Sequence, residues 1–186
     1  VLRSATKEVV IGADKPFCVI GERINPTGRP VLQAALREGD LSIIAKDVAA
    51  QVAGGADVLD INMGVPLTVE AELLVKAIQL VQSLTDLPIC IASSVVEALE
   101  AGLSVYQGRA LVNSITAEDE RMEQILPLVK KYDAAVIALP NDVDEIPMEP
   151  EKRLALVQKI IDVATGEYGI AMHDILIDPL AMPIGA

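Results

Sequence analysis

Polar side chains stand at or just after the end of six short apolar runs along the chain. They are Glu22 and Asn25, Asp60 and Asn62, Ser93 and Ser94, Asn113 and Ser114, Asn141 and Asp142, and Asp178. A single residue of this kind is usually a helix cap, but six successive run ends share one chemical character and include no Lys. Carboxylates accept hydrogen bonds from N–H groups, and amides both donate and accept. The set therefore suits a neutral, flat heterocycle that is rich in N–H donors.

Other kinds of site are poorly supported. A phosphate site would need a Gly-rich loop that leads into a helix, and neither GxGxxG nor GxxxxGK[ST] occurs. His173 is the only histidine and there is no CxxC pair, so we expect no metal site held by this chain. Cys18 and Cys90 each lie inside an apolar run, which predicts free thiols within the fold.

The composition limits the partners. A net charge of −12 argues against binding to nucleic acid or to an anionic membrane surface, because both require a basic patch. No apolar stretch approaches 18 residues, and no cationic segment followed by an apolar one resembles a signal peptide. We expect a cytoplasmic protein.

Apolar runs of strand length alternate with amphipathic stretches of helical period, which predicts a parallel α/β fold. The predicted strands are 17–21, 57–61, 88–92, 110–113, 134–139 and 174–178. Helices are predicted from about Leu41 to Gly54, over 69–84 with Thr68 as its cap, over 117–132 and over 150–167. Residues 1–15 are expected to form a hairpin or plug. An open sheet would suit the length, but the polar residues at every strand end favour a barrel, whose strand ends meet on one rim.

Four segments together resemble the pterin-binding methyltransferase family. They are FCVIGERINPTGR (17–29), VLDINMG (58–64), LVNS (111–114) and ILIDPL (175–180). This family includes methyltetrahydrofolate:corrinoid methyltransferases of anaerobes, the folate methyltransferase components of demethylation systems, and the folate domain of cobalamin-dependent methionine synthase. The resemblance implies a TIM (β/α)8 barrel of the pterin-binding type. About six of its eight units would be present, in one C-terminally incomplete domain over 1–186.

The resemblance also implies the site residues. The pterin ring would be bound by Asn113 and Asp178, with Asp60, Asn62 and Ser93 beside them, while Glu22, Asn25 and Ser114 would support the rim. The family's Asn that faces N5 would fall beyond residue 186, so no catalytic residue is assigned. Ala92 stands where the family places an Asp. Ser93, Ser94 or water would then replace the missing hydrogen bond, or the pterin would lie in a different orientation.

The implied activity is transfer of a methyl group between a corrinoid protein and N5 of tetrahydrofolate, with tetrahydrofolate or methyltetrahydrofolate as the substrate. The corrinoid would be carried by the partner protein, and a homodimer is expected. Two alternatives stay open. One is a dihydropteroate synthase-like pterin enzyme, and the other is a non-catalytic folate-binding subunit.

Overall fold

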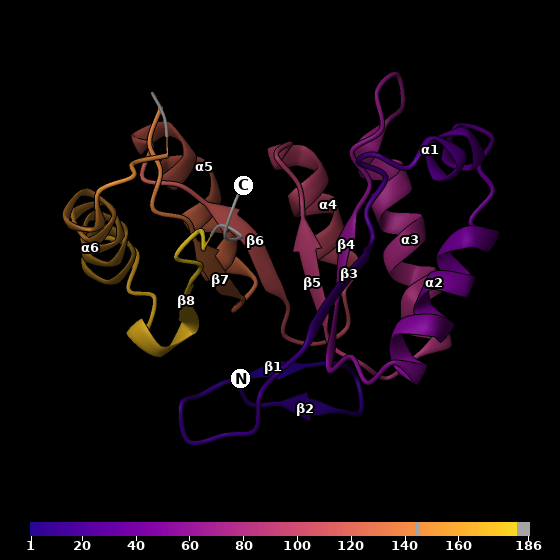
Figure 1. Ribbon diagram of the computed structural model, residues 1–186, viewed down its shortest axis with the longest axis horizontal. Coiled ribbons are helices and arrows are strands. Elements are labelled where there is room, and N and C mark those ends of the chain that lie inside the picture. The colour runs from indigo at the N-terminus through magenta and orange to yellow at the C-terminus, as the bar shows by residue number, and fades with distance from the viewer. Residues whose placement is uncertain (144–145, 182–186) are drawn as a thin grey trace. The chain divides into compact units, whose positions relative to one another are not determined.

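The computed structural model of the chain describes residues 1–143 and 146–181, so the end of the predicted domain, 182–186, lies outside it. Strands and helices alternate along these residues and group into two compact units, Val1–Leu111 and Val112–Ala186 (Figure 1). The strands follow chain order, β3-β4-β5 and then β6-β7-β8.

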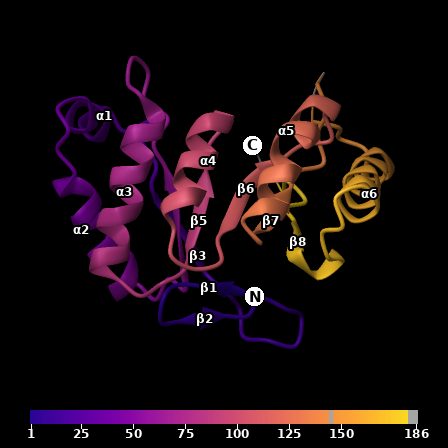
Figure 2. The ribbon, with the colours of Figure 1, turned by 180° about the vertical axis from the view of Figure 1, so that it is seen from behind.

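The first unit is a parallel sheet with helices packed against it. Its strands are β3 (Ile20–Ile24), β4 (Val58–Asn62) and β5 (Ile89–Ala92), and its helices are α1 (Pro30–Arg37), α2 (Ser42–Ala53), α3 (Glu70–Leu84) and α4 (Val96–Val105). Helices α2, α3 and α4 pack side by side and contact β3, β4 and β5 in turn (Figure 2). Strands β4 and β5 are buried almost throughout, as a parallel strand covered on both faces requires.

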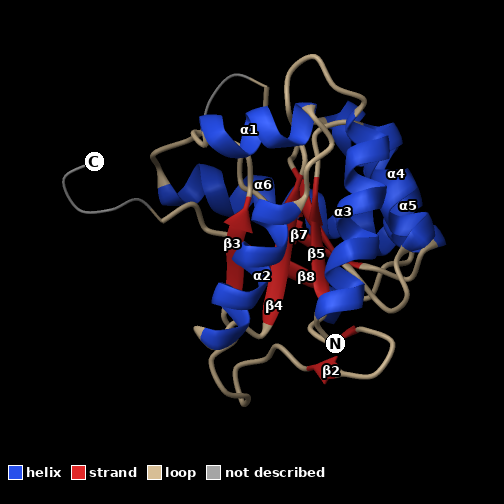
Figure 3. Ribbon diagram, turned by 90° about the vertical axis from the view of Figure 1, so that its right-hand side faces the viewer, coloured by secondary structure: helices blue, strands red, loops and turns tan. Residues whose placement is uncertain are grey.

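The second unit repeats the pattern. Its elements are β6 (Leu111–Ile115), which begins at the boundary, α5 (Asp119–Lys131), β7 (Ala135–Ala138), α6 (Pro150–Gly166), a 3₁₀ turn over Met172–Asp174, and β8 (Ile175–Ile177). Strands β7 and β8 pair in parallel, with Val136 opposite Ile175 and Ala138 opposite Ile177. The paired strands β3–β4 and β4–β5 of the first unit are also parallel, and Figure 3 shows β3, β4 and β5 pointing the same way.

The first core strand differs from its prediction. The apolar run 17–21 was expected to form it, but the strand covers Ile20–Ile24, and Phe17 is 90% exposed. Pairing decides this, since Ile20 lies opposite Val58 and Gly21 opposite Leu59. The register then shifts at Glu22 and Arg23, and Ile24 pairs with Ile61. Tertiary pairing has overridden the local preference for apolar residues in a strand.

Most helix ends were predicted correctly, but one cap was not. Helix α6 begins at Pro150, and Gly54 with Gly55 (φ 87°) closes α2. Thr68 does not cap α3, because its hydroxyl donates to the carbonyl of Val65 at 2.7 Å. None of the helices among the described residues has both the length and the apolar character needed to cross a bilayer.

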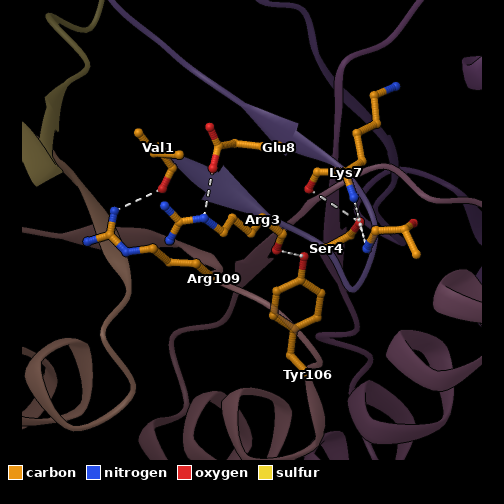
Figure 4. Close-up of polar contacts among 8 residues, drawn as sticks. Val1, Arg3, Ser4, Lys7, Glu8, Tyr106 and Arg109 are labelled. Atoms are coloured by element: carbon orange, nitrogen blue, oxygen red, sulfur yellow. Dashed lines mark hydrogen bonds and ion pairs between the residues drawn. The ribbon is translucent and has the colours of Figure 1, made fainter.

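The N-terminal residues form a short antiparallel pair, β1 (Leu2–Arg3) with β2 (Glu8–Val9). Tyr106 at the end of α4 connects this pair to the rest of the first unit (Figure 4). Its hydroxyl donates to the carbonyl of Arg3 at 2.7 Å and accepts from the amide of Ile89 at 3.1 Å. One side chain thus joins the N-terminal pair to strand β5.

We expect Tyr106→Phe to lower the free energy of unfolding by about 1–3 kcal/mol, because two backbone groups lose their partner. Burial raises the pKa of Tyr106 to about 12, above the value near 10 of an unfolded tyrosine. The contribution of the phenol is therefore present below about pH 10 and is lost as pH rises from about 10 to 12. Urea unfolding of both proteins across this range measures the difference. Tyr168→Phe is the matched control, and an equal loss there would contradict the assignment.

Candidate active site

One face of the sheet in the first unit carries Asp60 and Asn62 of β4 and Cys90 and Ala92 of β5. Asn62 and Ala92 end their strands, whereas Asp60 and Cys90 lie within them. The register places Asp60 opposite Cys90 and Asn62 opposite Ala92. Because side chains alternate along a strand, these four residues point to the same side of the sheet. Ala92, which stands at the position where the resemblance implies an Asp, therefore shares a face with Asp60 and Asn62.

Asp60 is the buried carboxylate of this face, with only 2% of its surface exposed. The thiol of Cys90 is hydrogen-bonded to it. Burial raises the pKa of Cys90 well above its ordinary value, and the negative charges of Asp60 and Glu22 raise it further. Cys90 is thus a protonated donor to Asp60 rather than a nucleophile, in agreement with the free, buried thiol expected from sequence.

Asn62 and Ser93 hold the loops that follow their strands. The Asn62 Oδ1 accepts a hydrogen bond from the amide of Gly64 at 2.8 Å. Ser93 is buried; its hydroxyl donates to the Glu70 carboxylate at 2.5 Å and accepts from the amide of Val95 at 2.9 Å. Ser93 therefore links the start of α3 to the loop before α4, and Glu70 is a contact that sequence reasoning missed.

The loop after β3 has its own polar support. Asn25 directly follows the strand, and its Oδ1 accepts from the amide of Thr27 at 2.9 Å. Arg29 binds Asp47 of α2 at 2.7 Å and also donates to the carbonyl of Arg23. The predicted position of Glu22 was wrong in one respect. Glu22 lies inside β3 rather than after it, because the strand begins and ends later than the apolar run.

In the second unit, Asn113 and Ser114 lie within β6 and are half-buried. Asp178 follows β8 directly and is exposed. The Asp178 amide donates to the carbonyl of Ala138 at 3.1 Å, and its Oδ1 accepts from the amide of Leu180 at 2.8 Å. The carboxylate is therefore oriented by backbone contacts, while its exposed side can still accept hydrogen bonds.

Arg153 of α6 supports the segment next to Asp178, a role that no sequence pattern indicated. Its Nε donates to the carbonyl of Pro147 at 2.6 Å, and its guanidinium donates to those of Pro179 and Leu180 at 2.8 and 3.2 Å. One side chain thus joins the loop after β7 to the loop after β8. The sequence does not distinguish Arg153 from other charged residues of a helix, because its partners are backbone carbonyls of two separate loops.

We expect Arg153→Met to loosen the segment that carries Asp178, because three carbonyls lose their donor while the apolar stem is kept. Hydrogen–deuterium exchange of a peptide covering 175–180 should become faster, and the free energy of unfolding should fall by about 1–2 kcal/mol. Lys152→Met on the same helix is the control, since Lys152 pairs with Glu149 at the surface. Unchanged exchange in 175–180 would contradict a supporting role for Arg153.

Among residues 1–143 and 146–181, no group of three or more His, Cys, Asp or Glu side chains is placed to hold a metal ion. Each unit carries carboxylate and amide side chains within its strands or directly after them. The first unit brings Asp60 and Asn62 onto one face, and the second carries Asn113 in β6 and Asp178 after β8.

Comparison with known proteins shows the family of the chain. A family model described as "Pterin binding enzyme" matches residues 21–186. A methylcorrinoid:tetrahydrofolate methyltransferase of Eubacterium limosum is 30% identical over 168 residues, which are 89% of this chain and 61% of that protein. The chain thus spans about three-fifths of the length of this relative.

Solved structures show the same fold. A dihydropteroate synthase from Vibrio fischeri ES114 aligns with 100% of this chain and 68% of its own, with a TM-score of 0.64 and 19% identity. The Xanthomonas albilineans dihydropteroate synthase with 4-aminobenzoic acid aligns over 89% of this chain and 62% of its own, with a TM-score of 0.65 and 22% identity. Together with the parallel strands and alternating helices, these likenesses establish the α/β fold of the pterin-binding TIM barrel, as the sequence predicted. The chain belongs to the family of pterin-binding enzymes.

Proposed function

We propose that the protein transfers a methyl group between N5 of tetrahydrofolate and a corrinoid carried by a partner protein. The observation that carries this proposal is the 30% identity to a protein named for that reaction, over 89% of the chain. The dihydropteroate synthase structures are less than 25% identical and support the fold alone.

Pterin recognition is assigned first to the second unit. Asp178 would accept hydrogen bonds from the amino group and ring N–H of the pyrimidine edge, and the Asn113 amide would bond another side of the ring. Asp178 suits this role because it is exposed and its backbone contacts fix its orientation. In the first unit, Asp60, Asn62 and Ser93 are proposed as further pterin contacts, with Glu22 and Asn25 as supporting residues. Ser114 of β6 is proposed as a supporting residue of the second unit.

Methyl transfer requires side chains that bind and orient the pterin, but no side chain that forms a covalent bond to the methyl group. Displacement of methyl from N5 has a poor leaving group, so N5 must be protonated or strongly hydrogen-bonded in the transition state. In the opposite direction N5 must be unprotonated to attack the methyl group. The corrinoid supplies the reactive cobalt centre, whereas the strand-end residues bind and orient the pterin. Neither direction requires a nucleophilic side chain of this chain.

The reaction products separate the proposal from its alternatives. The protein is incubated with tetrahydrofolate and a methylated corrinoid protein, and 5-methyltetrahydrofolate is measured by mass spectrometry. A parallel reaction supplies dihydropterin pyrophosphate and 4-aminobenzoate, and dihydropteroate is measured. Methyl-folate alone supports the proposal, and dihydropteroate alone supports a dihydropteroate synthase. Saturable tetrahydrofolate binding without either product would identify a folate-binding subunit and overturn the proposed activity.

A further inference from the structure

Asn141, three residues after β7, has a buried side-chain oxygen with no hydrogen-bond partner. Among the described residues, no donor lies within reach of its Oδ1. Its backbone is fully used, because the amide donates to the carbonyl of Leu139 and the carbonyl accepts from the amide of Ala117, each at 2.9 Å. The main chain is therefore fixed while the carboxamide oxygen is left without a partner.

The position of Asn141 within the second unit suggests what that partner is. Strand β7 lies between β6, which carries Asn113, and β8, which leads into Asp178. The segment after β7 is bonded to both neighbours, since Leu139 donates to Ile115 in β6 and Ala138 accepts from Asp178. Asn141 thus follows the strand that lies between the strands of Asn113 and Asp178, the two pterin ligands proposed for the second unit.

An unpaired buried acceptor lowers the stability of the free protein. Such a group often marks a functional site, where stability is given up for binding. Asn141 as a whole is only half-buried, and the terminal torsion of an Asn side chain is broad. A turn of the carboxamide can therefore bring its oxygen to a ligand at little cost.

We propose that Asn141 is a further pterin-binding residue of the second unit, whose carboxamide oxygen accepts a hydrogen bond from an N–H group of the ring. This rests on the proposed function, because it takes a pterin as the ligand of the strand ends. Asn141 would select ligands that carry an N–H donor at this point, since a ligand without one would leave the oxygen unpaired again.

This role predicts opposite effects on stability and on binding. Asn141→Leu has a similar shape and removes the unpaired acceptor, so its melting temperature should equal or exceed that of the wild type. Its dissociation constant for tetrahydrofolate should rise at least about fivefold. A side chain with only a structural role would instead lower the melting temperature when replaced and leave the affinity unchanged.

The experiment compares the wild type with Asn141→Leu, Asn141→Ala and Val143→Ala by thermal unfolding and by calorimetric titration with tetrahydrofolate. Asn141→Ala covers the case in which Leu does not fit, and Val143 is an exposed neighbour on the same loop. Weaker binding by both Asn141 variants, without loss of stability and with Val143→Ala unchanged, is the expected result. If either folded Asn141 variant binds tetrahydrofolate with wild-type affinity, the inference about Asn141 is wrong and the proposed function is unaffected. Failure of the wild type to bind tetrahydrofolate overturns the proposed function and this inference with it.

Discussion

Replacing Asp178 by Ala is expected to raise the dissociation constant for tetrahydrofolate by about tenfold or more. The carboxylate would lose charged hydrogen bonds to the pyrimidine edge of the pterin, each worth about 1.5–3 kcal/mol, and about 1.4 kcal/mol corresponds to a tenfold change in affinity. Calorimetric titration of the folded variant with tetrahydrofolate measures the effect.

Two further variants show whether the carboxylate itself is responsible. Asp178→Asn keeps an Oδ1 that can accept from Leu180, so it tests the charge without removing that turn contact. Asp162→Ala removes an exposed carboxylate from α6 that accepts from Gln158 of the same helix. Asp178→Asn should weaken binding and Asp162→Ala should not. Wild-type affinity in a folded Asp178→Ala variant would show that the pterin is bound elsewhere.

Ala92→Asp is expected to lower the free energy of unfolding by about 3–4 kcal/mol at pH 7, which corresponds to a carboxyl pKa raised by roughly two to three pH units. Ala92 is 6% exposed and shares a face of the sheet with Asp60, so a new carboxylate there would be desolvated and would meet a like charge. Both effects raise its pKa above the unfolded value of about 3.9. The loss should therefore be small below about pH 4 and should grow as pH rises from there to the raised pKa.

Ala92→Asn separates charge from size, because it adds nearly the same volume without ionising. Urea unfolding of both variants at pH 4 and pH 7 gives the comparison. Only Ala92→Asp should show a loss that increases with pH, whereas the loss in Ala92→Asn should stay constant. An Asp variant as stable as the wild type at pH 7 would show that position 92 can hold a carboxylate at no cost, as the resemblance implies for relatives.

The fold could be predicted largely from the sequence because its main signal is local. Strands β4 and β5 are near-continuous apolar runs, and the helix that begins at Pro150 has a readable start. Where pairing decides the boundary, the prediction failed. Strand β3 includes the charged residues Glu22 and Arg23 because the residues on either side of them, Gly21 and Ile24, pair with β4, whereas the apolar Phe17 stays outside the sheet. Helix α1, which follows the first loop, was not predicted, since only Leu32 and Leu36 mark its buried side.

For the site, the sequence by itself determined which residue types stand at the strand ends and which family they match. Only the tertiary structure decided what each of them contacts. In the structure the buried thiol of Cys90 is hydrogen-bonded to Asp60, and the Ser93 hydroxyl donates to Glu70. Arg153 donates to carbonyls of two loops, and the Asn141 Oδ1 has no partner among the described residues. The physical reason is that the identity of a strand-end residue is a local property, whereas its hydrogen-bond partners come from segments far away in the chain. Those partners are fixed only when the register of the sheet is set.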